Sequence, residues 1–278
     1  MSRIPNVLSI AGSDPSGGAG IQADLKTFAA FGCYGMAAIT ALTAQNTRGV
    51  RAIHMPPADF IAAQIDAIFE DISVDAVKIG MLGSGAIVEA VAGRLAHHGA
   101  CNIVLDPVLA ATSGDSLGAP DVVDAIMTKL LPLAAVVTPN LPEASRLIGR
   151  KVSGALEDMR KAGGELVALG ARAALVKGGH GDGREALDVL AMRTGAETFA
   201  AARISTRNTH GTGCTLSSAI AAGLARGQGL AQATGAAKAW LTGALRAADG
   251  LDVGISGRGH GPLDHLHALR GAGPTAPR

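Results

Sequence analysis

Short runs of apolar, often β-branched residues alternate along the chain with longer segments in which apolar residues recur at helical spacing. Residues 21–31 illustrate the longer segments, because Ile21, Leu25, Phe28 and Phe31 would share one face of a helix. Repeated strand–helix alternation is typical of a sheet whose strands run mostly parallel and whose two faces are both covered by helices. The pattern therefore predicts an α/β protein with three layers, in which the central sheet lies between two layers of helices.

The expected elements follow one another without an internal repeat or a long linker. Strands are expected at residues 7–10, 36–42, 50–55, 76–79, 103–105, 135–137 and 173–176, with two or three more within 187–204. Helices are expected at residues 21–31, 57–70, 84–98, 121–131, from about 141, 157–169, 214–226 and 230–247. We expect residues 1–270 to form a single domain and residues 271–278, rich in Gly, Pro and Ala, to be a flexible tail.

Composition supports a folded domain and narrows its partners. Apolar residues make up 48% of the chain, enough for a sizeable core, and charged residues only 17%. The 24 basic and 23 acidic residues leave a net charge of +1, which gives no reason to expect nucleic acid or an anionic membrane as partner. No apolar run approaches the roughly 20 residues of a membrane span, and residues 7–11 are too short for a secretory signal. We expect a cytoplasmic protein.

The three cysteines form no C-x-x-C pair, which argues against a disulfide scaffold or a zinc site. Cys33 and Cys101 are expected to fill space beside strands.

Polar side chains recur where the predicted strands end. The carboxyl ends of parallel strands meet at one edge of a sheet, which is where ligands of such folds bind. The sequence therefore predicts an active site at that edge. The residues at these ends are Ser13, Asp14, Gln45, Asn46, Asp106, Asn140, Lys177 and Asn208.

A glycine-rich segment, residues 11–20 (AGSDPSGGAG), follows the first strand and opens a helix. It matches neither the P-loop pattern, which needs a lysine, nor the G-x-G-x-x-G pattern, because Ala23 stands at the third glycine position. Two interpretations stay open. The segment is either an ordinary strand-to-helix turn or a loop whose backbone approaches a flat ligand, with Asp24 within reach.

A second glycine-rich segment, residues 210–215 (HGTGCT), leads into a long helix of small residues. The free amides at that helix start would form an anion site, and the same field would lower the pKa of Cys214. A cysteine there could act as a base on a hydroxyl group. The alternative is a flexible turn with an inert cysteine.

Together with further motifs, these segments resemble the hydroxymethylpyrimidine/phosphomethylpyrimidine kinases, a family with the ribokinase-like fold. The resemblance runs from about residue 6 to residue 266, and the ordered set of motifs is highly specific although each one alone is weak. The motifs are residues 11–24, 41–46 (ALTAQN), 77–82 (VKIGML), 138–143 (TPNLPE), 176–180 (VKGGH), 207–215 (RNTHGTGCT) and 259–263 (GHGPL).

The resemblance implies ATP-dependent phosphorylation of 4-amino-5-hydroxymethyl-2-methylpyrimidine, then of its monophosphate, in thiamine biosynthesis. It also implies Mg²⁺ as cofactor and a homodimer. Phosphoryl transfer depends mainly on positioning and on positive charge, which these residue types supply. The implied roles are catalysis by Cys214 with an anion hole at Gly211, Thr212 and Gly213; pyrimidine binding by Gln45, Asp24, Gly12, Met81 and Val108; ATP binding by Lys177, Asn140, Lys238 and Asp106; and Mg²⁺ held by Glu143 and Asn140 through water.

Single residues also have simpler interpretations. Glu143 and Lys238 could be solvated helix charges, Lys177 a surface lysine, Gln45 a turn residue and Asp106 a turn former before Pro107. The histidines show no paired metal spacing, so we expect them to be structural or exposed.

One position departs from the family pattern. Many members carry a lysine where this chain has Thr112, which bears on loop closure and on affinity for the monophosphate.

Three other functions compete. A pyridoxal or pyridoxine kinase of the same superfamily would bind a similar flat ring with a hydroxymethyl arm. A catalytically silent pyrimidine sensor would keep the pocket without the chemistry. A dinucleotide oxidoreductase is disfavoured because its fingerprint is absent.

Overall fold

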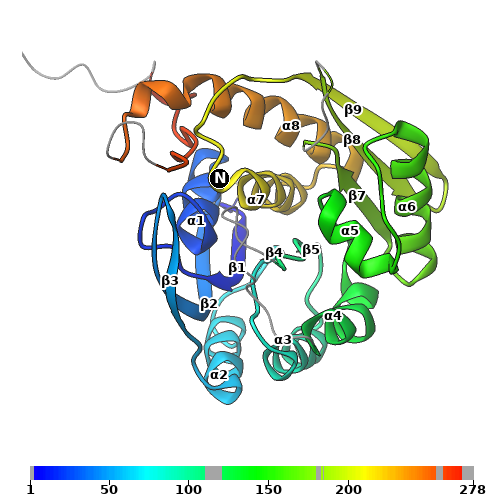
Figure 1. The fold of residues 1–278 in the computed structure, drawn as a ribbon. Coiled ribbons are helices and arrows are strands. Elements are labelled where there is room, and N and C mark those ends of the chain that lie inside the picture. The colour runs from blue at the N-terminus through cyan, green and yellow to red at the C-terminus, as the bar shows by residue number, and fades with distance from the viewer. Residues whose placement is uncertain (1–2, 110–120, 180–182, 184, 255–258, 271–278) are drawn as a thin grey trace, which may run out of the picture.

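Nine strands form one continuous sheet at the centre of the computed structural model (Figure 1). The structure describes residues 3–109, 121–179, 183, 185–254 and 259–270. The spatial order is β3-β2-β1-β4-β5-β6-β7-β8-β9. The bounds are β1 (Asn6–Gly12), β2 (Tyr34–Asn46), β3 (Gly49–His54), β4 (Ala76–Ile79), β5 (Ile103–Leu105), β6 (Val136–Val137), β7 (Ala173–Lys177), β8 (Glu185–Met192) and β9 (Gly195–Ala202). The unbroken sheet supports our proposal that residues 1–270 form one domain.

The six central strands run parallel, as the sequence predicts, and the three outer ones run antiparallel. Strands β2, β1, β4, β5, β6 and β7 pair in parallel, whereas β3, β8 and β9 pair in antiparallel fashion. Every residue of β4, β5 and β7 is buried. Burial on both faces explains why these strands are mostly apolar in the sequence, with Lys78 and Lys177 as the charged exceptions.

Helices cover both faces of the sheet (Figure 1). Side chains of α1, α7 and α8 form one apolar cluster with the sheet, and those of α2 to α6 pack on the other face. The bounds are α1 (Gly20–Ala30), α2 (Ala58–Phe69), α3 (Gly85–His97), α4 (Asp121–Ala125), α5 (Leu141–Ile148), α6 (Leu156–Ala168), α7 (Thr212–Ala225) and α8 (Leu230–Ala247), with the 3-10 turn η3 (Ala248–Leu251) after α8. Within the described ranges, no helix combines the length and the apolar character that crossing a bilayer would require.

One predicted helix differs in form. The sequence predicts a helix over residues 121–131, but α4 is followed by a π-helical turn η1 (Ile126–Leu130) and a 3-10 turn η2 (Leu131–Leu133). Pro132 cannot continue an α-helical hydrogen-bond ladder. The widened turn lets Ile126, Leu130 and Leu131 all be buried in the core.

Strand β2 is longer than predicted, and this extension positions part of the site. It continues to Asn46 and pairs with β3, with a register irregularity between Ala44 and Gln45. The strand therefore carries Thr43 and Gln45 beyond the edge of the parallel sheet.

The C-terminal segment docks on α7 through a buried hydrogen bond. The Thr215 hydroxyl lies 3.0 Å from Nε2 of His265, and His265 is 3% exposed. Burial and the neighbouring Lys26 ammonium group lower the pKa of His265 from 6.5 to about 4. The imidazole is therefore neutral in the folded protein over the pH range in which an unfolded histidine becomes protonated.

We predict an acid-dependent loss of stability from His265. As the pH falls from about 6.5 to about 4, His265 binds a proton in the unfolded chain but stays neutral in the folded chain. The free energy of unfolding should fall over that window by up to about 3 kcal/mol. Urea titrations of the wild type and His265→Gln across this range measure the effect. The wild type should lose more stability than the variant, and His54→Gln, at an exposed site, is the matched control; equal pH slopes in all three proteins would contradict the assignment.

Candidate active site

A single cavity of about 710 Å³ opens at the carboxyl edge of the parallel strands. Its volume lies in the range of small-molecule sites. The cavity brings together almost every residue that the sequence nominates. Those on its wall are Gly12, Gln45, Met81, Asp106, Val108, Asn140, Glu143, Lys177, Gly211, Thr212, Gly213, Cys214 and Lys238.

The glycine-rich turn before α7 forms one side of the cavity. Gly211 adopts the left-handed conformation (φ 82°) as the N-cap of α7, and a Cβ there would collide with the Gly18 carbonyl oxygen. A Cβ at Gly213 would lie 3.3 Å from Nζ of Lys177, so the turn lies directly beside the lysine ammonium group. Amides at a helix start and a lysine opposite them are suited to holding a phosphoryl group.

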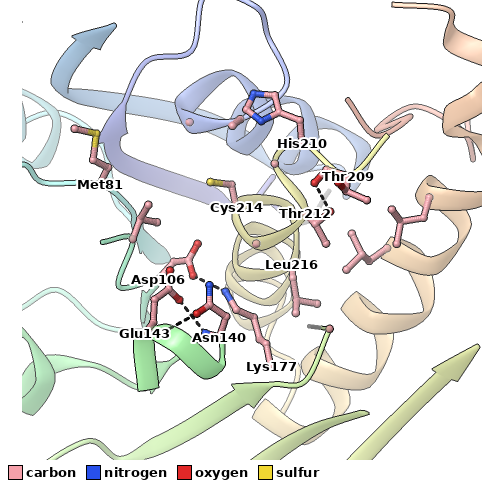
Figure 2. Close-up of a pocket in the computed structure, with 18 of the residues that line it drawn as sticks. Met81, Asp106, Asn140, Glu143, Lys177, Thr209, His210, Thr212, Cys214 and Leu216 are labelled. Atoms are coloured by element: carbon pink, nitrogen blue, oxygen red, sulfur yellow. Dashed lines mark hydrogen bonds and ion pairs between the residues drawn. The ribbon is translucent and has the colours of Figure 1, made fainter. Parts of the chain in front are cut away.

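Cys214 lies at the first turn of α7, and Figure 2 shows it between Met81 and Thr212, with the group around Asp106 below it. The predicted lowering of its pKa is wrong. Burial raises the pKa of the thiol to about 11, and the Lys78 ammonium group and the Gly20 amide offset this only in part. The helix field is weaker than the cost of desolvating a thiolate, so the thiol is neutral at physiological pH.

Asp106 and Lys177 form a buried ion pair at the cavity floor. Lys177 Nζ lies 2.8 Å from Asp106 Oδ1, and the Thr138 hydroxyl donates to the same oxygen at 3.1 Å. Burial opposes ionisation of Asp106, but the Lys177 and Lys78 ammonium groups hold its pKa below the usual value. The simple interpretations of Lys177 as a surface charge and Asp106 as a turn former do not fit this burial.

Asn140 and Glu143 begin α5 with a reciprocal capping box. The Asn140 side chain accepts from the Glu143 amide, and Glu143 accepts from the Asn140 amide, each at 2.8 Å. Glu143 is only 8% exposed, so it is not a solvated helix charge, and burial raises its pKa to about 7. The box orients both side chains toward the cavity, where Figure 2 shows them beside Asp106 and Lys177.

These oxygen donors fit a hydrated magnesium ion rather than a fully protein-bound one. The described residues contain no group of three or more His, Cys, Asp or Glu arranged to hold a metal. Mg²⁺ binds through one or two carboxylates and keeps several waters. Glu143, assisted by the Asn140 amide oxygen, could therefore hold it only with water or substrate oxygens completing its shell.

The opposite end of the cavity is lined by Gly12, Met81 and Gln45, none of which carries a charge. A Cβ at Gly12 would lie 3.1 Å from Met81 Sδ and 3.6 Å from the Ala41 side chain, so the glycine keeps a slot open beside Met81. The Thr43 hydroxyl lies 3.3 Å from Gln45 Oε1 and donates to the Ser13 carbonyl. One side-chain amide beside apolar walls suits a neutral heteroaromatic ring.

Asp24 is not part of the cavity wall, which corrects its predicted contact with the ligand. It is fully buried and accepts from Ser9, from Lys78 through both oxygens and from Ser218, at 2.6 to 2.9 Å. The face of α1 that carries it packs against the sheet instead of the pocket. Lys78, its ion-pair partner, lines the cavity in its place.

Lys238 lies on the cavity wall and is not solvated. Its Nζ is 2.6 Å from Asp188 Oδ2, while Asp188 Oδ1 accepts from the Gly178 amide. The ion pair of Lys238 and Asp188 connects α8 to β8.

Sequence reasoning missed a pair that joins the two glycine-rich segments. His210 Nε2 lies 2.7 Å from Asp14 Oδ2, and both residues line the cavity. Burial opposes ionisation of Asp14, but hydrogen bonds from His210 and Ser16 hold its pKa at about 2. The only sequence signals were the place of Asp14 at a strand end and of His210 beside Gly211.

Two predicted strand-end residues do not reach the site. Asn208 donates to Asp249, and Asn46 accepts from the Arg48 amide. Conversely, Arg146 and Arg203 line the cavity without having been predicted. Thr112 and His180 lie outside the described residues.

Comparison with known proteins finds a matching family and similar proteins over nearly the whole chain. Residues 14–264 match the family described as Phosphomethylpyrimidine kinase. The chain is 51% identical over 268 residues to the hydroxymethylpyrimidine/phosphomethylpyrimidine kinase of Escherichia coli, covering 96% of this chain and 99% of that protein.

Solved structures extend the likeness to a related activity. The ADP complex of Bacillus subtilis pyridoxal kinase has a TM-score of 0.86 at 37% identity, covering 96% of this chain and 99% of that one. The Staphylococcus aureus pyridoxal kinase with AMP-PCP and pyridoxal has a TM-score of 0.87 at 33% identity, covering 97% and 96%. These likenesses confirm the ribokinase-like fold.

Proposed function

We propose, from the premise that this chain belongs to the phosphomethylpyrimidine kinase family, that it phosphorylates a hydroxymethylpyrimidine with ATP. The acceptor is 4-amino-5-hydroxymethyl-2-methylpyrimidine and then its monophosphate, and the diphosphate serves thiamine biosynthesis. The observation that carries the proposal is one cavity that holds both the anion-binding turn with Cys214 and the slot beside Met81 and Gln45.

Each end of the cavity has a part in the proposed reaction. The pyrimidine would lie between Gly12, Met81 and Val108, with Gln45 pairing to its polar edge. The amides of residues 211–213 and the Lys177 ammonium group would hold the transferring phosphoryl group. The thiolate form of Cys214, at the start of α7 between these ends, would accept the proton of the substrate hydroxyl.

ATP and Mg²⁺ complete the proposed site. Lys177, Lys238, Asp106 and Asn140 would form its nucleotide side, while Glu143 and Asn140 would hold a hydrated Mg²⁺. The ion would neutralise phosphate charge as it develops.

The same turn supports the second phosphorylation, because an anion site also suits a monophosphate acceptor. Mass spectrometry of products from the pyrimidine, ATP and Mg²⁺ tests the proposal. We expect mono- and diphosphate to appear in succession. Binding of the pyrimidine without release of ADP would instead indicate a silent sensor, against which the intact Asn140, Glu143 and Cys214 argue.

Pyridoxal phosphorylation is the second candidate, favoured by the likeness to the pyridoxal kinases. Comparison of kcat/KM for the two acceptors decides between them. We expect the pyrimidine to be preferred, and a strong preference for pyridoxal would overturn the main proposal.

Gln45→Leu is predicted to weaken pyrimidine binding selectively. Removing the amide at similar volume leaves a ring polar group unpaired, which costs about 1–3 kcal/mol. KM for the pyrimidine should rise roughly 5- to 150-fold while KM for ATP stays within about twofold. Gln232→Leu, at an exposed position on α8, is the matched control. An equal rise in both KM values would remove Gln45 from the pyrimidine site.

A cytoplasmic homodimer is a further part of the proposal. The β2–β3 hairpin and the adjoining α2 expose Leu42, Ile53, Met55 and Phe60, side chains that a second copy could cover. Light scattering on the purified chain would measure the mass, and a monomer at all concentrations would contradict the dimer.

A further inference from the structure

A buried ionic cluster lies behind Cys214, and the mechanism described so far does not use it. Both carboxylate oxygens of Asp24 lie 2.9 Å from Nζ of Lys78, and neither side chain is exposed to bulk solvent. Ser9 and Ser218 donate to the same carboxylate, each at 2.6 Å. The Asp24 carboxylate therefore fixes the lysine in one position at the base of the site.

Three features of the fold place the cluster on the same side of the cavity as the Cys214 side chain. Ser218 stands four residues after Cys214, so both lie on one face of α7, and Ser218 binds Asp24 directly. Lys78 and Cys214 line the same cavity. Gly20, where α1 begins, lines that cavity as well. A cation and a helix start from outside α7 thus share the cavity with the thiol.

Space for this cation is built into the strand end. A Cβ at Gly80 would lie only 2.9 Å from Nζ of Lys78, so a larger residue there would displace the ammonium group. Glycine at this position keeps Lys78 close to the cavity.

The proposed reaction would be favoured by a cation near the Cys214 sulfur. If Cys214 takes the acceptor's hydroxyl proton, the reactive form of the sulfur is an anion, and burial disfavours it. Lys78 on β4 favours that anion, whereas Asp24 on α1 and Asp106 beyond β5 oppose it. Lys177 on β7 also faces the sulfur, although Asp106 is its ion-pair partner.

We propose that Lys78, held by Asp24, is a positioning residue whose ammonium group favours the anionic form of the Cys214 sulfur. The catalytic consequence rests on the proposed kinase function. The acceptor oxygen bonds to phosphorus as the bond from phosphorus to the departing ADP oxygen breaks. The hydroxyl proton passes to the sulfur, which later releases it to water.

Alkylation of Cys214 by iodoacetamide across pH 7 to 10 tests the inference without requiring kinase activity. A Cys101→Ser background removes the exposed thiol, while Cys33 is buried. Lys78→Met should slow alkylation at a given pH by roughly tenfold, one pKa unit, because the thiolate population falls. Asp24→Asn should accelerate it, because the asparagine keeps one oxygen that can accept from Lys78 while the opposing charge is lost. A purely structural pair would move both variants in the same direction, and that result would overturn the proposal.

Two further variants keep the test decisive. Ser218→Ala keeps both charges and should leave the alkylation profile within about twofold of the background. If either single variant fails to fold, the double variant Asp24→Asn/Lys78→Met avoids an unpaired buried charge. It should still react more slowly than the background, because Lys78 acts on the sulfur more strongly than Asp24 does. An unchanged or faster double variant would overturn the proposal.

Kinetics separates this inference from the proposed function. In Lys78→Met, kcat should be roughly tenfold below that of the wild type at each pH from 7 to 10, and kcat of both proteins should rise with pH because the thiol pKa lies at about 11. If the chain phosphorylates no pyrimidine but the alkylation shifts occur as described, the proposed function fails and the role of Lys78 stands.

Discussion

Replacing Cys214 with alanine or serine is expected to lower kcat by about 100-fold or more, the usual contribution of a positioned acid–base group. The sulfur lies at the start of α7, between the ring slot and the anion-binding turn, so it is placed to receive the hydroxyl proton. The groups proposed for ATP, Lys177 and Lys238, keep their own carboxylate partners in these variants. KM for ATP should therefore change by less than about threefold.

Steady-state kinetics with both substrates measures this split. Cys101→Ser replaces an exposed cysteine and serves as the matched control, which should retain full activity. A change confined to KM for ATP would remove Cys214 from proton transfer. The pKa of the Cys214 thiol is about 11, so little thiolate is present at neutral pH. The residual kcat of Cys214→Ser therefore shows how much of the catalysis depends on proton transfer to residue 214. A small loss would mean that positioning by the turn supplies most of the catalysis.

Gly211→Ala is expected to lower kcat/KM by about 1,000-fold, because it distorts several amides that would contact the phosphoryl group at once. Gly211 has φ 82°, and a methyl group there would collide with the Gly18 carbonyl oxygen. Relief of that collision requires the turn before α7 to separate from the loop after β1. The anion site would then lose its geometry even if the fold survives.

Gly227→Ala is the matched control for backbone strain. Gly227 has φ 80°, but a Cβ there would meet nothing within 4 Å. Both alanines adopt the same disfavoured conformation, which costs about 1 kcal/mol of stability. Activity assays beside thermal unfolding curves distinguish the two effects. Similar catalytic losses in both variants would show that strain, rather than the turn's contact with Gly18, is responsible.

The sequence was informative wherever one local pattern decides the structure. The bounds predicted for strand β4 match the observed ones, because three of its four residues are apolar and the strand is buried on both faces. The sequence also predicts Ser84 as a helix cap, and its side chain accepts from the Ile87 amide. Four candidate site residues, Gln45, Asp106, Asn140 and Lys177, were indicated because parallel strands end at a common edge, whereas the glycine-rich segments and the family resemblance indicated the others.

The failures have a common physical cause. The charge state of Cys214 depends on burial, which a helix-start rule does not include. The contacts of Asp24 depend on which face of α1 meets the sheet, and position on the first turn does not settle that. The pair of Asp14 and His210 joins residues 196 positions apart, so no local pattern could reveal it.

The strand order also bears on how the chain is made. From β4 to β9 each new strand adds to the edge left by the one before it, so the sheet can grow in the direction in which a ribosome releases the chain. The cavity cannot form in the same gradual way, because its wall runs from Ala11 to Leu245 and α7, which carries the proposed anion site, begins only at Thr212. A nascent chain would thus fold most of its sheet before it can bind nucleotide. Enzymatic activity would appear only after the segment that forms α7 and α8 has been synthesised.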